Sequence, residues 1–511
     1  MLVLWITVMC WIPATVVGFV PARQPQNPLG RTNTRLFQSS YIATCIPGLA
    51  EVLGDELRAL GCSHVSPQGQ AAVQFHCDST KTALETIVYC RTAHKILELL
   101  CESTVSDRDD LAAFCRDSIP VQELLGDGQG GLLTLSVSSI LNGRVPKDLN
   151  HSHFTALTVK NALCDVVRDL RGDRPNVDVD NPDVPLVLAL AGRGEKAHAS
   201  LYRQLHTGSL HKRGYRSVIH KAAMKETMAA GLLAMAGWAE ACRRSSEEPA
   251  ILVDPMAGSG TLLIEGAMIA ADLAPGLMRI KCGVHGARDP PIVRWKNDDD
   301  VVGIWRDVLL EASERAKRGL AAIREGGSIE ILGNELNEGA ARLCFDSLAM
   351  AGFEDVVTFE DGDCAEFIPP SRQKDTTPFL VVTNPPWGVR LSDDIADSWE
   401  ALALFVRHVC PPGSNLWVLS GNKKSTKALR LKRTRAYPLK TGQQDLRWIH
   451  YELRSREEMV AMSEARDVAV QEATKASRHE DVRDVPSKVP SNRVARRRPT
   501  PALERNEWLI D

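Results

Sequence analysis

A glycine-rich turn between an apolar strand and a helix limits the folds open to this chain more than any other feature. Residues 251–265 read as a strand that ends at Asp254, a turn that contains Gly258 and Gly260, and an amphipathic helix. Glycine lets a ligand approach the backbone, and the N-terminus of the helix offers unpaired N–H groups. The segment therefore predicts a nucleotide-type cofactor loop. It lacks the lysine of a G-x-x-x-x-G-K-[ST] loop and the G-x-G-x-x-G spacing, so ATPase and dinucleotide interpretations are weak.

A second apolar strand, residues 379–383, ends in the rigid turn Asn384-Pro385-Pro386-Trp387. Two prolines fix the backbone and remove two N–H donors, so carbonyl oxygens and an amide side chain are presented at the carboxyl edge of the sheet. Ligands bind at that edge in open α/β sheets. Acceptors beside an indole suit a flat base whose exocyclic amine donates to Asn384 and Pro385 while Trp387 stacks on the ring. The alternative is a structural turn with a packed Trp, which would have to coincide with the glycine-rich turn.

The 511 residues are enough for two or three domains. Strands and helices alternate from residue 221 to 453, which predicts a largely parallel sheet covered on both faces. Two smaller α+β blocks precede this part. In these blocks we expect strands at 41–46, 71–76, 132–137 and 185–190, and helices at 49–60 and 79–100.

The cations of the chain are concentrated in two runs. The formal net charge of -3 argues against coating of nucleic acid through overall charge, so any contact must come from local patches. No acidic residue occurs between Glu195 and Glu226, or between Glu400 and Asp445. Such runs are often solvated helix faces, but the base-binding turn just upstream of the second run favours phosphate contact. The candidate nucleic-acid contacts are Lys212, Arg213, Arg216, Lys423, Lys424 and Arg433.

The two ends of the chain have the composition of segments outside a fold. Residues 2–17 are apolar, and an Arg- and hydroxyl-containing stretch without acids follows, since the first acidic residue is Glu51. This order resembles the two-part presequences of algae with multiply bounded plastids, so we expect the mature protein in the plastid stroma. A mitochondrial location, secretion or a membrane anchor are the alternatives. The 13 Cys include no C-x-x-C pair, which predicts reduced thiols and no metal site. The charged residues 455–511 are expected to be disordered.

Taken together, the motifs resemble a known family. Residues 254–261 with residues 383–390 resemble the S-adenosylmethionine-dependent amino-methyltransferases. The further segments 209–216, 224–227 and 271–277 resemble a narrower group, the bacterial THUMP-domain methyltransferases that modify the guanine exocyclic amine in large-subunit ribosomal RNA. The similarity covers about residues 41 to 453. Ala257 stands where the family has Cys, and Trp387 where Tyr is commoner, but both changes leave the backbone and the aromatic face in place.

This resemblance implies an α/β fold, namely a Rossmann-like methyltransferase sheet preceded by an α+β ferredoxin-like and THUMP RNA-binding region. Some bacterial members carry a second methyltransferase domain, and we expect only one here. The implied divisions are a presequence (1–40), a ferredoxin-like domain (41–105), a THUMP domain (106–206), a methyltransferase domain (207–454) and a charged tail (455–511).

The resemblance also implies S-adenosyl-L-methionine as the cofactor. Asp254 and the glycine-rich turn would hold its methionine end, Glu335 its ribose and Asp363 its adenine amine, with residues 272–327 as an insertion between them. The implied cofactor-binding residues are Asp254, Met256, Gly258, Ser259, Gly260, Thr261, Glu335 and Asp363.

The implied activity is methylation of the exocyclic N2 amine of a guanine in 23S-type ribosomal RNA, with no metal and no stable membrane association of the mature chain. Asn384, Pro385, Pro386 and Trp387 would be catalytic, because acceptors at the amine stabilise the charge that develops during in-line attack. No Cys lies near Trp387 in sequence to act as the nucleophile of pyrimidine-carbon methylation. A transfer-RNA guanine methyltransferase and a non-catalytic ribosome-assembly factor remain open, and the N-terminal region argues against DNA adenine methylation.

Overall fold

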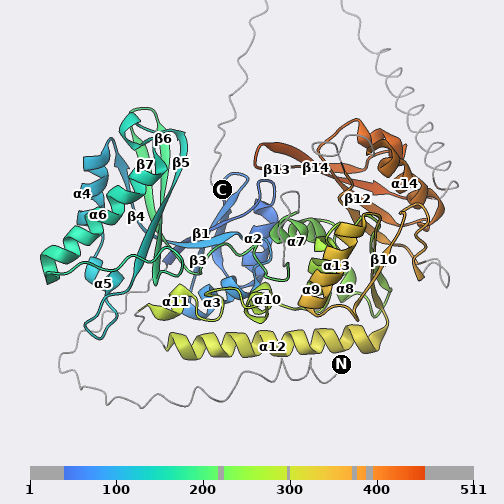
Figure 1. Ribbon diagram of the computed structural model, residues 1–511, viewed down its shortest axis with the longest axis horizontal. Coiled ribbons are helices and arrows are strands. Elements are labelled where there is room, and N and C mark those ends of the chain that lie inside the picture. The colour runs from blue at the N-terminus through green and yellow to red at the C-terminus, as the bar shows by residue number, and fades with distance from the viewer. Residues whose placement is uncertain are drawn as a thin grey trace, which may run out of the picture.

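The computed structural model describes residues 39–216, 224–295, 300–370, 377–386, 395–454 and 458. Two seven-stranded sheets organise these residues, one in the N-terminal part and one in the C-terminal part (Figure 1). Most of the predicted presequence, most of the predicted tail and Trp387 lie outside the described residues.

The first sheet has the strand order β2-β3-β1-β4-β7-β6-β5. The central strand β4 pairs antiparallel with β1 on one side and with β7 on the other. The two N-terminal blocks expected as separate domains therefore share one continuous sheet through β4. The strands are β1 (Ser39–Thr44), β2 (Ser63–Pro67), β3 (Ala72–Cys77), β4 (Lys95–Val105), β5 (Leu135–Arg144), β6 (Val184–Arg193) and β7 (Ala197–Gln204). The helices are α2 (Ala50–Ala59), α3 (Thr80–Tyr89), α4 (Arg108–Ser118), α5 (Val121–Leu125) and α6 (Ser152–Arg171), with the short helix η1 (Lys147–Leu149).

The single long helix expected at 79–100 is wrong. Ser79 caps α3 by accepting a hydrogen bond from the Thr82 amide (3.1 Å), but the helix ends at Tyr89 and β4 begins at Lys95. Leu97 in β4 is fully buried. Pairing with strands on both sides overrides the local helical pattern, because burial between two neighbours stabilises a central strand more than propensity does.

The second sheet has the order β10-β9-β8-β11-β12-β14-β13. The first five strands in this order are parallel, whereas β14 pairs antiparallel with both β12 and β13. After β8 the chain adds β9 and β10 on one side and β11 on the other. A crevice that binds ligands forms at such a switch point, at the carboxyl ends of the strands. The strands are β8 (Ala250–Asp254), β9 (Ile329–Glu335), β10 (Val357–Asp361), β11 (Leu380–Thr383), β12 (Asn415–Ser420), β13 (Arg435–Thr441) and β14 (Gln444–Glu452).

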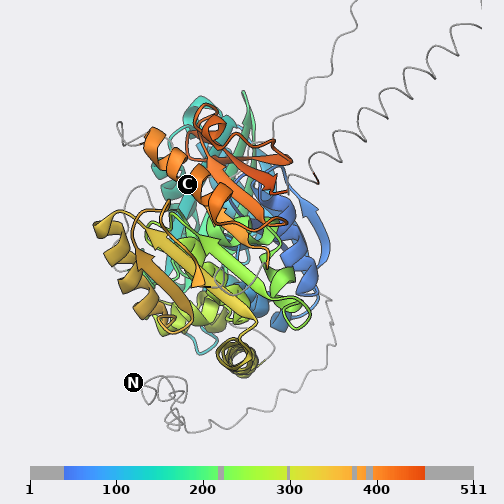
Figure 2. The same cartoon turned by 90° about the vertical axis from the view of Figure 1, so that its right-hand side faces the viewer.

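Helices cover this second sheet and connect it to the first. The predicted insertion at 272–327 contains α10, α11 and α12, and α12 packs against α3 of the N-terminal part (Figure 2 shows α12 end-on). The two parts are in close contact, since a Cβ atom on Gly276 would lie 2.7 Å from the Cα atom of Val88. The helices are α7 (Glu226–Met235), α8 (Trp238–Arg243), α9 (Thr261–Ala270), α10 (Pro275–Lys281), α11 (Pro291–Arg294), α12 (Val301–Gly326), α13 (Glu338–Ala351) and α14 (Ile395–His408), with the short helix η3 (Ser425–Leu429).

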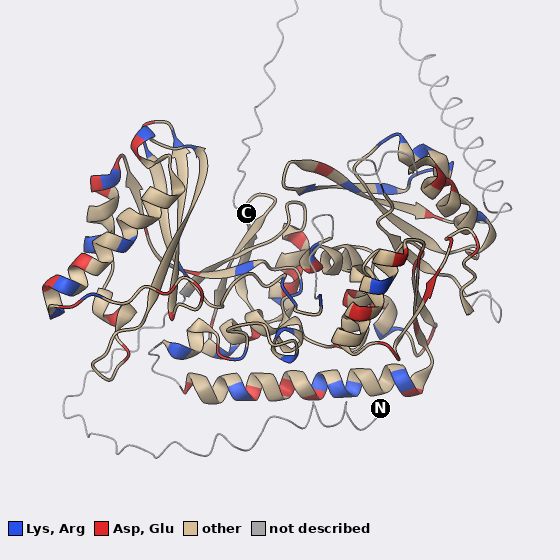
Figure 3. Ribbon diagram, viewed as in Figure 1, with Lys and Arg blue, Asp and Glu red and all other residues tan. Residues whose placement is uncertain are grey.

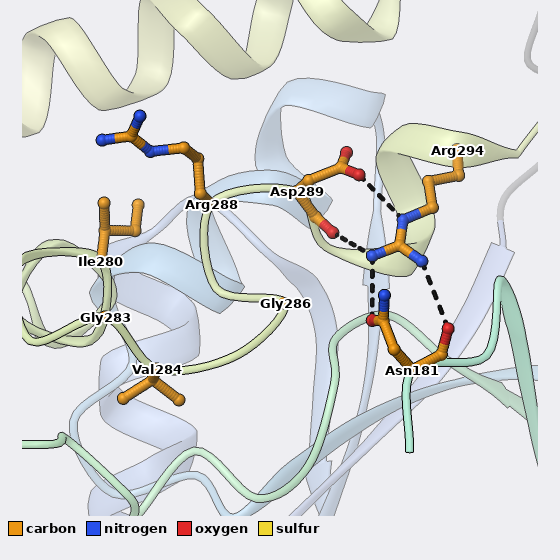
Figure 4. Close-up of a pocket in the computed structure, with 8 residues that line it drawn as sticks. All are labelled: Asn181, Ile280, Gly283, Val284, Gly286, Arg288, Asp289 and Arg294. Atoms are coloured by element: carbon orange, nitrogen blue, oxygen red, sulfur yellow. Dashed lines mark hydrogen bonds and ion pairs between the residues drawn. The ribbon is translucent and has the colours of Figure 1, made fainter. Parts of the chain in front are cut away.

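A cavity of about 440 Å³ lies between the loop before β6 and the loop that joins α10 to α11. Arg294 links its walls, because it donates to Asp183 (3.1 Å), to the Asn181 side chain (3.0 Å) and to Asp289 (3.0 Å) (Figure 4 shows the contacts with Asn181 and Asp289). The cavity adjoins the end of α10 rather than the ends of β8 and β11, so we do not assign the cofactor to it.

No single helix among the described residues is long and apolar enough to cross a membrane. Among the residues that the structure describes, one pair of helices, α9 and α10, meets the length and composition when taken together, but the pair is bent by 113° at its junction. Most residues of both helices are buried inside the protein.

Candidate functional site

The glycine-rich turn connects β8 to α9 at the switch point of the second sheet. Both glycines of this turn have a left-handed backbone, with φ +57° at Gly258 and +77° at Gly260. A Cβ atom on Gly260 would lie 2.5 Å from the Cys344 sulfur on α13, whereas one on Gly258 would meet no protein atom within 4 Å. Gly260 is thus required for packing, and Gly258 leaves open space above the backbone for a ligand. Met256 and Ser259 are partly exposed beside it, and Thr261 is buried.

Asp254 ends β8 and is 1% exposed. One of its carboxylate oxygens accepts a hydrogen bond from the Met256 amide (3.2 Å). Burial raises the pKa of Asp254 to about 7, against the opposing effects of the Thr383 hydroxyl and the Met256 amide. A carboxyl group that is costly to ionise in the protein alone is suited to a ligand that brings its own positive charge.

We expect this raised pKa to make stability depend on pH. A carboxyl group whose pKa is higher in the folded than in the unfolded chain contributes its full stability only below the unfolded pKa, near 4. That stability is lost as pH rises through about 7. The variant Asp254→Asn cannot ionise. Its free energy of unfolding relative to that of the wild type should therefore rise by on the order of 2 kcal/mol between pH 5 and pH 8. Guanidinium unfolding at both pH values measures this difference, and parallel pH profiles for the two proteins would contradict it.

Glu335 lies at the end of β9, next to the glycine-rich turn. Its carboxylate accepts from the Gly258 amide (2.7 Å) through one oxygen and from the Asn337 amide (2.9 Å) through the other. The neighbouring Asn334 side chain donates to the Gly362 carbonyl (2.8 Å) after β10. These bonds bring residues 77 positions apart together at one sheet edge. Each carboxylate oxygen keeps a second lone pair that can accept a hydroxyl hydrogen.

Asp363 follows β10, the strand next to β9. Its carboxylate accepts from the Ala365 amide (2.8 Å), and the Gly362 amide donates to the Glu335 backbone carbonyl (3.1 Å). The pairing of Asp361 with Glu335 places the two strand ends side by side. The structure therefore brings together the glycine-rich turn, Glu335 and Asp363, which the family resemblance implies as cofactor residues.

Two exposed apolar side chains in this region escaped the sequence analysis. Leu336, directly after Glu335, is 68% exposed, and Ile368, five residues after Asp363, is 54% exposed. An exposed apolar side chain directly after the end of a strand, such as Leu336, suits contact with a flat ring. The only signal in the sequence is an apolar residue directly after a strand-terminal acid, which is too common to single out.

Asn384, Pro385 and Pro386 follow β11, which pairs with β8 on one side and with β12 on the other. The register of Val381 with Val253 places this turn just beyond the end of β8. Asn384 is half-buried and Pro385 is buried. The indole of Trp399 on α14 donates to the Pro386 carbonyl (2.8 Å) and anchors the turn. The acceptor turn and the glycine-rich turn thus share one sheet edge, on adjacent parallel strands.

Arg213 and Arg216 are not available to RNA, so these two predictions are wrong. Arg213 is fully buried, where it donates to Glu265 (3.3 Å) and to the Leu210 carbonyl (2.6 Å). The Arg216 side chain is 5% exposed and pairs with Glu226 (3.2 Å). The run is free of acids in the sequence, but α7 and α9 supply carboxylates to both guanidinium groups in space.

The other four predicted RNA contacts, Lys212, Lys423, Lys424 and Arg433, are exposed. Lys423 and Lys424 follow the end of β12, at the same sheet edge as Asn384, and Lys and Arg gather in the region around α14 (Figure 3). Arg433 is placed differently, because the next residue donates to the His450 carbonyl near the far end of β14. The structure therefore brings Lys423 and Lys424, but not Arg433, to the candidate site. Nowhere in the described part of the chain do three His, Cys, Asp or Glu side chains form a group that could hold a metal ion.

Comparison with known proteins finds three family matches along the chain. Residues 40–97 match the family described as RlmL ferredoxin-like domain, residues 145–193 the THUMP domain, and residues 213–450 the family described as RMKL-like, methyltransferase domain.

Curated relatives and solved structures are also similar to this chain. It is 31% identical over 418 residues to the ribosomal RNA large subunit methyltransferase K/L of Syntrophotalea carbinolica, covering 81% of this chain and 53% of the relative. It is 33% identical over 409 residues to that of Cellvibrio japonicus, covering 79% and 49%. The chain thus spans about half the length of these relatives. A solved putative methyltransferase complexed with SAH has the same fold, with a TM-score of 0.65 at 20% identity over 82% of this chain and 98% of that chain.

Proposed function

We propose that this chain, which combines an RlmL-type ferredoxin-like domain, a THUMP domain and an RMKL-like methyltransferase domain, methylates the exocyclic N2 amine of a guanine in large-subunit ribosomal RNA, with S-adenosyl-L-methionine as the methyl donor. The resemblance inferred from the motifs is confirmed at the level of these domains, and so is the fold class. The observation that carries the proposal is the meeting of the glycine-rich turn and the Asn384-Pro385-Pro386 turn at one edge of the second sheet.

The residues at this edge fit the proposed cofactor. Asp254 offers a buried carboxylate to its ammonium group, Glu335 can accept from ribose hydroxyls, and Leu336 offers an apolar contact to adenine. Gly258 leaves the space that a ligand needs near the backbone. When bound, S-adenosylmethionine supplies a methyl group on a sulfonium centre that is open to attack by a weak nucleophile.

The Asn384 turn fits an amine as the acceptor. The lone pair of a guanine N2 amine is delocalised into the ring, so the amine is a poor nucleophile. The Asn384 side-chain oxygen and the Pro385 carbonyl can accept its two hydrogens, favour a pyramidal nitrogen and stabilise the positive charge that develops there. They also hold the amine in line with the methyl group. The proton can leave to water after transfer.

An RNA substrate is supported by the THUMP domain and by the exposed Lys423 and Lys424 beside the site. The names of the curated relatives, ribosomal RNA large subunit methyltransferase K/L, support the large-subunit RNA as the target. Phosphate contacts from lysines position a strand without reading its sequence, so they leave the choice of base to the Asn384 turn.

We expect the chain to form N2-methylguanosine in 23S-type ribosomal RNA and not in transfer RNA. The measurement is mass spectrometry of nucleosides after incubation of each unmodified RNA with the protein and isotopically labelled S-adenosylmethionine. Label in transfer RNA alone would move the substrate to that class, and labelled N6-methyladenosine would contradict the choice of base. Absence of label from both RNAs would favour a non-catalytic assembly role.

We also propose the plastid stroma as the location, on the composition of residues 1–40 alone. A fluorescent reporter fused to these residues should accumulate in the plastid of an alga whose plastid has extra membranes. Accumulation in mitochondria or in the medium would contradict this location.

A further inference from the structure

Helix α9 carries the glycine-rich turn at its N-terminus and is held at its other end by the ferredoxin-like domain. Arg91, between α3 and β4, donates to the Leu273 carbonyl (3.0 Å) and to the Met268 carbonyl (3.4 Å) at the end of α9. A guanidinium group at this position pairs the last carbonyls of a helix and suits the negative end of its dipole. The Arg91 amide in turn donates to the Glu56 carboxylate (3.1 Å) on α2.

The middle of α9 is held by the segment that joins the two parts of the protein. Arg213 and Tyr215 both donate to the same carboxylate oxygen of Glu265 on α9, each at a distance of 3.3 Å. All three residues are 0% exposed. Arg213 also donates to the backbone carbonyl of Arg91 (2.5 Å). These four residues, Arg91, Arg213, Tyr215 and Glu265, form one connected group, here called the α9 clamp.

The N-terminal end of the clamped helix is where the cofactor is proposed to bind. A helix of ten residues is about 15 Å long, so a tilt of a few degrees at the clamped end moves the other end by about 1 Å. A misplacement of about 1 Å can lower the rate of an enzyme by about 100-fold, so a preorganised site depends sharply on the position of its backbone. The placement of Gly258 therefore depends on contacts made at the opposite end of α9.

We propose that the α9 clamp positions the cofactor turn, so that the ferredoxin-like domain determines the affinity for S-adenosylmethionine without touching it. Arg91 is a positioning residue in this proposal, which rests on the proposed function for the identity of the ligand. Within the clamp, Arg213 and Glu265 form a fully buried ion pair. Arg91 is half-buried and its guanidinium group is bonded to backbone carbonyls of the α9 region. The clamp therefore acts through the geometry of α9 and not by attracting RNA.

A second arginine provides a matched control. Arg294 also joins the two parts of the protein, through Asp183 and Asn181, and its side chain is 16% exposed. It makes these bonds at the cavity beside α11 (Figure 4). Its hydrogen bonds among the described residues go to Asn181, Asp183 and Asp289, and none of these lies on α9. Removing Arg294 should therefore weaken the contact between the two parts without moving the cofactor turn.

The experiment measures the dissociation constants of S-adenosylmethionine and of 23S-type RNA, together with the melting temperature, for the full chain and three variants. For Arg91→Met we expect about tenfold weaker binding of S-adenosylmethionine and RNA binding within about twofold of the wild type. Arg91→Lys should recover most of the loss, since its ammonium group can reach one of the two carbonyls. Arg294→Met should lower the melting temperature but leave both dissociation constants unchanged. If Arg91→Met does not fold, Glu265→Gln replaces it, because this change keeps the shape of the side chain and removes the charge.

The outcomes separate this proposal from the proposed function. Unchanged binding of S-adenosylmethionine by Arg91→Met or its replacement, or an equal loss in Arg294→Met, would overturn the clamp while the function stands. A wild-type chain that binds no S-adenosylmethionine would overturn both.

Discussion

Replacing Asn384 with alanine is expected to lower the rate of methyl transfer by about 1000-fold, while S-adenosylmethionine still binds within about twofold of the wild-type affinity. The side-chain oxygen of Asn384 is proposed to accept a hydrogen of the target amine, and its contribution is made mainly as positive charge develops on that nitrogen. The turn itself should persist in the variant, because Trp399 holds the Pro386 carbonyl and the two prolines fix the backbone.

Single-turnover kinetics with saturating RNA measure the rate, and calorimetry measures cofactor binding. Asn384→Asp is the matched control, with a side chain of similar shape and an added negative charge. Because it keeps an acceptor oxygen, it should retain more activity than the alanine variant. Full activity of Asn384→Ala, or loss of cofactor binding in it, would contradict the assigned role.

The second large effect is expected from the glycine-rich turn. Substitution of Gly258 should mainly weaken cofactor binding, whereas substitution of Gly260 should mainly destabilise the fold. Gly258→Ala should lower the affinity for S-adenosylmethionine by about 100-fold, with a stability cost of about 1 kcal/mol for the left-handed backbone. The added methyl group meets no protein atom within 4 Å, so it would occupy the space proposed for the ligand.

Gly260→Ala should instead destabilise the fold by about 3 kcal/mol, because its Cβ atom would lie 2.5 Å from the buried Cys344 sulfur in addition to the backbone strain. Guanidinium unfolding and calorimetry on both variants test the pair. Normal cofactor binding by Gly258→Ala would show that the open space at Gly258 is not the ligand site, and equal stability losses would contradict the packing role assigned to Gly260.

The positions of the two turns could be predicted from the sequence because their signals are local. Each turn is marked by an apolar strand, a break by glycine or proline and characteristic turn residues. All of these signals lie within the short segment 251–265 for the first turn and around Asn384 for the second. Parallel strands have their carboxyl ends at the same edge, so two such turns on neighbouring strands meet there. Glu335 and Asp363 required the family resemblance, because a single acid at a strand end is common.

The boundaries between the N-terminal elements were less predictable. Residues 95–100 have an apolar pattern that fits the end of a helix, but β4 occupies them because strands β1 and β7 are available on both sides. The same strand joins two blocks that look separate in the sequence. Such pairings depend on segments about 50 to 100 residues away, which a local pattern does not record.

The sequence by itself determined the chemistry offered at the sheet edge: the glycine turn, the acceptor turn, Asp254 and Glu335 at the ends of their strands, and Asp363 just after its strand. Only the tertiary structure decided which cations are free to meet RNA. Arg213 and Lys424 belong to similar acid-free runs, yet one is buried against Glu265 and the other is exposed beside the site. The reason is physical. Local backbone signals act between neighbours along the chain, whereas the partner of a charge is whichever opposite charge the fold brings within a few ångströms.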